Sequence, residues 1–199
     1  MTIETEPAFE VVDLEQTPLR ELNARLHAAA EEPGSPRHWR VSNPGGRHAI
    51  AVGLNAPFEV DVEGHVGYYC AGKNQQAVVR VHGNCGVGVA ENMMSGSVVV
   101  EGNASQSAGA TGRGGLLVIR GVASSRCGIS MKGVDIVVRG DVGSLGADCV
   151  QKELRDEHVQ EVRALLESAG IADVNPEDIR RYGSARELYN FRVDDAGEF

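Results

Sequence analysis

The sequence predicts a mainly β protein, a right-handed parallel β-helix of about nineteen residues per coil with short flanking α-helices. The first observation is a repeat: five short apolar runs each end at a glycine, and successive glycines are nineteen residues apart. The second is that apolar and polar residues alternate within the runs, as in a strand with one buried face. A repeat of this length with this alternation is typical of stacked solenoid coils. The repeat glycines are Gly64, Gly83, Gly102, Gly121 and Gly140.

The columns of the repeat indicate which side chains face the interior. Positions four and two residues before each glycine hold only Val, Leu or Ile, which predicts the buried face of each strand. The position seven residues after it holds only Ala or Gly, which predicts a narrow corner. Glycine suits both a turn with positive φ and a contact between coils that is too close for a Cβ atom. The corner residues are Ala71, Ala90, Gly109, Gly128 and Ala147.

Three regions are predicted along the chain. Residues 1–37 form an N-terminal arm with one helix, for which Thr17 is the expected N-cap and Pro18 the first helical residue. Residues 38–149 form the β-helix. Residues 150–199 form a helical extension, with one helix from Asp156 to a stop at Gly170 and a second over 175–183. These helices are expected to cover the ends of the solenoid, where strand edges would otherwise be unpaired.

Composition and charge exclude several classes of protein. The formal net charge is −9 and the sequence shows no basic stripe, whereas binding to phosphate backbones needs clustered Lys and Arg. Neither nucleic acid nor an anionic membrane surface is therefore an expected partner. Only 5% of residues are aromatic, so the core must be built from small and β-branched side chains. The N-terminus has no apolar signal segment and no run is long enough to span a membrane, so a cytoplasmic location is expected.

No residue is predicted to bind a cofactor or a metal. The segment GNCGVGVAENMMSG, residues 83–96, is one corner and return of the repeat, and it lacks the strand–loop–helix context of a dinucleotide site. The four cysteines have no zinc-type spacing and are expected to be reduced and buried. Cys70 and Cys127 share a column, but three coils separate them by about 14 Å, which is too far for a disulfide.

One column carries candidate catalytic groups. The residue before each repeat glycine is Glu63, His82, Glu101, Arg120 or Arg139. The first three could form an acid–imidazole–acid cluster, with the two carboxylates about 10 Å apart, near the separation used by inverting glycosidases. The alternative is a solvated charge ladder, because the column faces outward and its sign changes along the solenoid. The charge ladder is the favoured interpretation, so no catalytic residue is predicted.

The column that follows the glycine has a different composition. It favours corner residues of the Asn and Asp type, which tolerate left-handed backbone geometry. Its members are His65, Asn84, Asn103, Val122 and Asp141.

Residues 68–133 resemble, in order and spacing, the GXGXG-repeat family, which includes the C-terminal β-helix domain of the glutamate synthase large subunit. The tail RRYGSARELYNF, residues 180–191, is similar to the small β-helix subunit of N-methylglutamate synthase (methylamine–glutamate N-methyltransferase) and to GlxC-like proteins. The resemblance covers about residues 38–199. Family members carry further coils before a similar LGADC segment, so the solenoid here is expected to be shorter by about two coils, which bears on docking to the usual partners.

The resemblance implies a complex of three subunits that transfers the methylamino group of methylamine to a glutamate skeleton. The partners would be a class-II glutamine-amidotransferase-like subunit and a glutamate-synthase-like subunit that binds FMN and iron–sulfur clusters. This chain would be a non-catalytic scaffold without cofactors; it begins Met1-Thr2, not with the amidotransferase's cysteine nucleophile. Two alternatives stay open: the scaffold of another glutamate-synthase-like amidotransferase complex, and a free-standing β-helix hydrolase or lyase.

Overall fold

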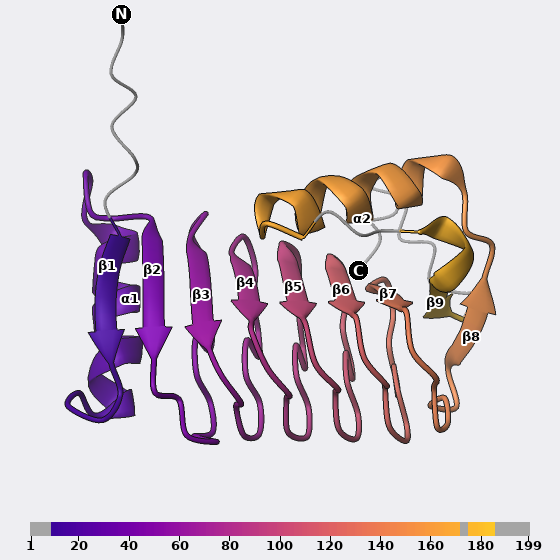
Figure 1. Ribbon diagram of the computed structural model, residues 1–199, viewed down its shortest axis with the longest axis horizontal. Helices are drawn as coiled ribbons and strands as arrows, with labels where there is room; N and C mark the ends of the chain where they lie inside the picture. Colours follow the sequence, from indigo (N-terminus) through magenta and orange to yellow (C-terminus); the bar gives the residue numbers. More distant parts are fainter. Residues whose placement is uncertain (1–8, 172–174, 186–199) are drawn as a thin grey trace, which may run out of the picture.

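The computed structural model describes residues 9–171 and 175–185 and shows a parallel β-solenoid with about nineteen residues per turn (Figure 1). The predicted fold class is confirmed. The described residues form a nine-stranded sheet in the order β1-β2-β3-β4-β5-β6-β7-β9-β8, in which β1 to β7 are parallel and β9 is antiparallel to both its neighbours. The strands are β1 (Phe9–Asp13), β2 (His38–Ser42), β3 (Glu59–Glu63), β4 (Val78–Val81), β5 (Ser97–Val100), β6 (Leu116–Ile119), β7 (Asp135–Val138), β8 (Cys149–Lys152) and β9 (Arg180–Ser184).

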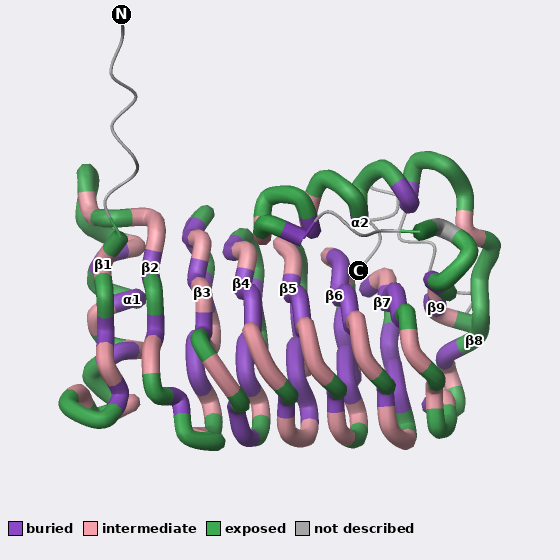
Figure 2. Tube along the Cα trace, viewed as in Figure 1, coloured by how far each residue is buried: buried purple, intermediate pink, exposed green. Residues whose placement is uncertain are grey.

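The strand register follows the nineteen-residue repeat. Val60 pairs with Val79, Val79 with Val98, Val98 with Leu117 and Leu117 with Ile136, and all five side chains are fully buried. A second line of parallel bridges runs from Val66 through the coils to Val142. Every coil contains buried residues (Figure 2), and these form one continuous core. The interior is thus filled by short side chains stacked in columns, as the low aromatic content requires.

Contact between coils explains the repeat glycines. Only Gly64 has a positive φ, of 134°; the four that follow it do not. A Cβ atom on Gly102 would lie 2.7 Å from the carbonyl oxygen of Gly83, and one on Gly140 would lie 2.5 Å from that of Gly121. Real Cβ atoms do not approach a backbone this closely, so these positions exclude every other residue type because the coils stack, and not because the chain turns.

The column after the glycine does not adopt the left-handed geometry that the sequence analysis expected, because its members bond to the next coil instead. The Nδ1 atom of His65 accepts a hydrogen bond from the backbone N–H of Asn84 (2.9 Å). The Oδ1 atoms of Asn84 and Asn103 accept bonds from the backbone N–H groups of Asn103 and Val122, both at 2.8 Å. None of His65, Asn84 and Asn103 has a positive φ. The amide side chain is selected here because it supplies an acceptor to a backbone donor one coil away.

The corner column lies inside the solenoid for four of its five members. Ala71, Ala90, Gly109 and Gly128 are buried and have φ values between 53° and 66°. Ala147 departs from the pattern and is exposed. The reason is that the chain leaves the coil path at this point and enters β8 at Cys149.

Helix α1 (Leu19–Glu31) lies in the connection from β1 to β2 and packs against the first coil. Leu22 and Leu26 are fully buried in the main core. Asn23 donates a hydrogen bond to the carbonyl of Ala49 and accepts one from the N–H of Ala51. The N-cap is Pro18, without a side-chain cap, so Thr17 was wrongly predicted in that role; its backbone N–H instead closes a turn onto Asp13.

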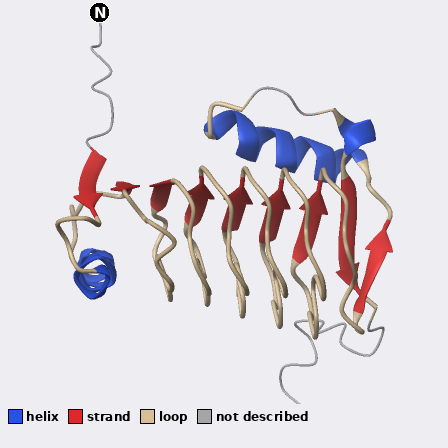
Figure 3. Ribbon diagram, turned by 60° about the horizontal axis from the view of Figure 1, so that its bottom comes forward, coloured by secondary structure: helices blue, strands red, loops and turns tan. Residues whose placement is uncertain are grey.

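Helix α2 (Asp156–Ser168) does not cover the end of the solenoid. It runs across the coils on the outer face of the sheet (Figures 1 and 3). There Val162 and Leu166 join Val99, Val118 and Val137 in a second core. The prediction failed because the outward position three residues before the glycine is valine in β5, β6 and β7, which creates a second apolar face that needs a cover.

The second C-terminal helix, expected over 175–183, was also wrong. Residues Pro176–Asp178 form a single 3₁₀ turn, η1, and β9 follows. Tyr182 is buried and pairs with Ile136 and with Gln151. Strand β9 therefore covers the open edge of β7, which was the role that the sequence analysis gave to a helix.

Candidate functional site

The outer face of the sheet divides into a polar and an apolar half. At the position three residues before the glycine, β3 and β4 present Asp61 and Arg80, whereas the next three strands present valines beneath α2. The strand period sends Val60 and Val62 inward and leaves Asp61 outward. The polar half therefore carries the cluster of titratable groups that the sequence singled out.

His82 lies at the centre of this cluster. Its Nδ1 is 2.8 Å from Oε1 of Glu101, and its Nε2 is 3.2 Å from Oδ1 of Asp61. The three side chains are 31%, 30% and 19% exposed. The hydrogen bond that His82 donates to Asp61 raises the pKa of His82, and the bond that it donates to Glu101 adds to this against the opposing effect of desolvation. The pKa of Asp61 is lowered: desolvation pushes it up, but the bond to His82 and the charge of Arg80 outweigh that effect.

Arg80 joins the cluster to α2. Its side chain is 4% exposed, and its Nη2 donates to Oε2 of Glu59 at 2.8 Å and to Oγ of Ser168 at 2.9 Å. Asp61 lies 3.8 Å from its Nη1, while its Nε has no hydrogen-bond partner. A buried guanidinium needs such carboxylate partners, so Arg80 fixes the last turn of α2 against β3 and β4.

This arrangement suits a structural ion network better than a catalytic centre. Both ring nitrogens of His82 face carboxylates, so the favoured species is an imidazolium that donates on both sides and has no lone pair with which to accept a proton. The candidate cluster that the sequence analysis set against the favoured charge ladder differs in one member: Asp61 contacts His82, whereas Oε1 of Glu63 lies 3.3 Å from Nε of Arg40. The sequence analysis compared only the residues directly before each glycine, so it missed Asp61, a diagonal neighbour of His82 on the same face of the sheet.

Within the described residues, no group of three or more His, Cys, Asp and Glu side chains could hold a metal ion. The four cysteines are free and buried. Burial raises the pKa of Cys70 and of Cys127 to about 12 and that of Cys149 to about 11. These thiols stay protonated at neutral pH, so they are poor nucleophiles and metal ligands.

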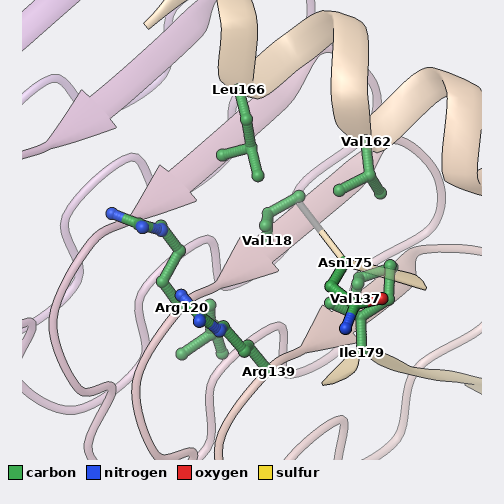
Figure 4. A pocket seen from close by; sticks show the side chains of 9 residues that line it. Val118, Arg120, Val137, Arg139, Val162, Leu166, Asn175 and Ile179 are labelled. Atoms are coloured by element: carbon green, nitrogen blue, oxygen red, sulfur yellow. The ribbon is translucent and has the colours of Figure 1, made fainter. Parts of the chain in front are cut away.

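A small pocket of about 10 Å³ lies in the seam between α2 and the sheet. Figure 4 shows Val162 and Leu166 of the helix opposite Val118 and Val137, with two arginines beside them. Its volume is that of about one water molecule. The pocket is therefore a packing gap and not a substrate site. The remaining lining residues are Ile119, Arg120, Arg139, Asn175 and Ile179.

Comparison with known proteins identifies a relative that matches nearly the full chain. Protein GlxC of Rhizobium meliloti (strain 1021) is 51% identical over 227 residues, which cover 95% of this chain and 99% of that protein. This chain is a member of the GlxC family. No protein-family model matches the sequence, so membership of the GXGXG-repeat family stays a prediction. No solved structure matches the chain.

The GlxC relative is longer than this family member. The alignment has 227 positions, whereas 95% of the 199 residues here is about 189, so about 38 positions have no counterpart in this chain. That number equals the length of two nineteen-residue coils, and the loss of two coils from the solenoid stays a prediction. Whole coils can be lost without a change of register, because each coil contacts only its neighbours.

In the described part of this GlxC-family chain, no helix has both the length and the apolar character that a membrane crossing requires.

We expect the His82 network of this GlxC-family protein to stabilise the fold in a pH-dependent way. The folded-state pKa of His82 is raised, so its contribution is complete below the ordinary value of 6.5 and is lost as the pH rises through the raised value. The free energy of unfolding of the wild type should exceed that of His82→Gln by about 1 kcal/mol at pH 5.5 and by less at pH 8.5. Urea titration at each pH measures both values.

Asp61 fixes the acid side of this pH window. Its pKa is lowered, so its contribution is complete above 3.8 and is lost only as the pH falls through the lowered value. Arg163→Gln, an exposed change on α2, is the control and should show no pH trend. A His82→Gln effect that is equal at pH 5.5 and 8.5, or larger at pH 8.5, would contradict the assignment of an imidazolium.

Proposed function

We propose that this chain is the non-catalytic β-helix subunit of an N-methylglutamate synthase-type complex, which is related to glutamate synthase. The complex would transfer the methylamino group of methylamine to a glutamate skeleton in the cytoplasm. Its partners would be a class-II glutamine-amidotransferase-like subunit and an FMN-binding glutamate-synthase-like subunit, and the latter would also carry the iron–sulfur clusters. A complex of the same design that acts on another amine is the alternative.

The observation that carries this proposal is the 51% identity with GlxC over nearly the whole chain, on a solenoid in which the repeat glycines from Gly83 to Gly140 are needed for stacking. A phosphate-binding loop offers free backbone N–H groups to its ligand. Here the N–H groups of Gly102 and Gly121 bond to the glycine carbonyl one coil earlier, both at 3.0 Å. The same segment cannot serve both purposes, so the family resemblance to a scaffold is favoured over a nucleotide-binding function.

Co-expression tests the proposal. We expect the chain to purify with the amidotransferase-like and FMN-binding subunits, through an interface of more than about 1,000 Å². Purified alone, it should be colourless and form no N-methylglutamate. Omission of this chain should prevent assembly or leave incomplete complexes, without a change in the flavin spectrum of the FMN-binding subunit.

Two results would overturn the proposal. One is stoichiometric flavin absorbance by the isolated chain, and the other is turnover of any amine substrate by the isolated chain. A panel of amines given to the assembled complex separates the methylamine reaction from the alternative, since the preferred substrate would then be a different amine.

A further inference from the structure

The segments that lead into β4, β5, β6 and β7 together carry a positive charge, whereas the chain as a whole is negative. The four corner segments 73–77, 92–96, 111–115 and 130–134 contain three Lys or Arg residues and no Asp or Glu. The whole chain has 28 acidic residues against 19 Lys and Arg. Stacking brings these segments together, because equivalent positions in successive coils are neighbours. The acidic excess therefore lies elsewhere on the surface.

A hollow of about 340 Å³ opens on this stripe. Lys73, Arg113 and Met94 are exposed, and Met94 is 41% accessible. Within the described residues, neither cationic side chain has a hydrogen bond or an ion pair. The hollow is lined by Lys73, Gln75, Asn92, Met94 and Arg113, which come from three successive coils. We refer to these five residues as the cationic hollow.

The backbone beneath the cationic hollow is held rigidly. The N–H groups of Lys73 and Arg113 bond to the carbonyls of Glu91 and Met93, both at 2.8 Å. Asn92 is fixed by hydrogen bonds to Tyr69 (3.3 Å) and Thr111 (2.8 Å). Glu91 directly precedes Asn92 of the cationic hollow, but its carboxylate lies against Gly88. The two cations therefore project from a preformed frame and lack an acidic partner in the described part of the chain.

We propose that the cationic hollow docks an extended acidic segment of a partner protein. Arg113 lies two coils beyond Lys73 and two residues further along its coil, so their backbones are more than about 10 Å apart at the usual strand spacing. A polyproline-II segment places side chains on one face every three residues, about 9 Å apart. Carboxylates at that interval would reach both cations, and an apolar residue between them would contact Met94. A chain segment with two carboxylates can contact both cations at once, which favours a chain segment over a single small anion.

The charge of the stripe supports this choice of occupant. Lys73 and Arg113 create a local positive potential on a chain of net charge −9, and a carboxylate that approaches them is attracted by that potential. The proposal rests on the proposed scaffold function for the source of the segment, but the binding measurement below is independent of it. The interaction is expected to be weak alone and sensitive to salt, since exposed ion pairs are screened.

The direct test is fluorescence anisotropy with a labelled peptide that repeats Glu-Pro-Leu three times, in 50 mM NaCl. The double variant Lys73→Glu/Arg113→Glu should bind it at least about tenfold more weakly than the wild type. The matched control Arg20→Glu/Arg163→Glu makes the same change of charge at exposed positions on α1 and α2, and should bind within about twofold of the wild type. A peptide with Gln for Glu should not bind.

Several results would overturn the proposal. They are no binding of the acidic peptide up to 1 mM, equal loss in both double variants, and equal binding of the Gln peptide. Displacement by succinate at the same concentration as the peptide would instead indicate a small-anion site and reject a protein segment. If the wild-type chain fails to bind the peptide while co-purification persists, the docking site is wrong and the scaffold function stands. If the peptide binds but no partner co-purifies, the scaffold function is wrong.

Discussion

Gly121→Ala should destabilise the fold by about 3 kcal/mol or more, the upper range for overpacking. A Cβ atom at this position would lie 2.5 Å from the carbonyl oxygen of Gly102 and 2.7 Å from its carbonyl carbon. Both are backbone atoms, so no rotamer change can relieve the contact. The coils must separate, which weakens the 3.0 Å hydrogen bond between the two glycines and the 2.8 Å bond from Val122 to Asn103.

The measurement is thermal and urea denaturation of the full chain. A loss of this size should lower the melting temperature by about 6–12 °C in a domain of this length. Gly143→Ala is the matched control: its Cβ would lie 3.3 Å from Ser124 and its φ is not in the left-handed region, so a loss below about 1 kcal/mol is expected. Equal losses in the two variants would mean that coil contact is not what selects glycine in the repeat column.

The sequence alone was sufficient to predict the solenoid because its period is encoded at almost every position of the central coils. Strand registers from β3 to β7 follow the nineteen-residue spacing without exception. β1 was not predicted, because it precedes the repeat and pairs with β2 at a different spacing. Strand stacking can be predicted from the repeat, and β1 lies outside the repeat.

Both errors at the C-terminus arise because tertiary contacts outweigh local sequence preference. A helix over 175–183 was inferred from residues that favour helix ends, whereas the edge of β7 requires a hydrogen-bonding partner. Local preference is weak compared with the backbone bonds that β9 makes to both β7 and β8. The position of α2 was likewise decided by a tertiary feature, the stacked Val99, Val118 and Val137, which a single strand does not reveal.

The candidate sites were predictable only in part. His82 and Glu101 were singled out because they share a column, but Asp61 is a diagonal neighbour that a column cannot show. The cationic hollow was missed altogether, and the sequence was taken to have no basic stripe. Lys73 and Arg113 are forty residues apart in the chain and become neighbours only through stacking. The informative signal was the charge of equivalent segments, 73–77, 92–96, 111–115 and 130–134, compared from coil to coil.

Gly109→Leu should destabilise the fold by about 3 kcal/mol or more, through overpacking together with left-handed strain. Gly109 is buried at a φ of 66°, and its Cβ would lie 2.7 Å from Cδ1 of Ile136 and 3.3 Å from Cδ2 of Leu117. Both are movable side-chain ends, so Gly109→Ala should cost less than about 1 kcal/mol; Ala71 and Ala90 already adopt this backbone in the same column. A leucine side chain has a larger volume than the narrow interior can accommodate.

The size of the interior can be tested by compensation. Ile136→Ala alone should cost about 2–5 kcal/mol, because it leaves a cavity at a fully buried position. In the double variant with Gly109→Leu, the leucine side chain can fill most of the cavity that Ile136→Ala leaves. The double variant should therefore be more stable than the sum of the two single losses predicts, by at least about 1 kcal/mol, as expected for residues in contact. Urea unfolding of the four proteins measures this coupling. A Gly109→Leu loss below about 0.5 kcal/mol, or strictly additive losses, would mean that the corner column does not face Ile136 across the interior, since only a shared space can make one substitution relieve the other.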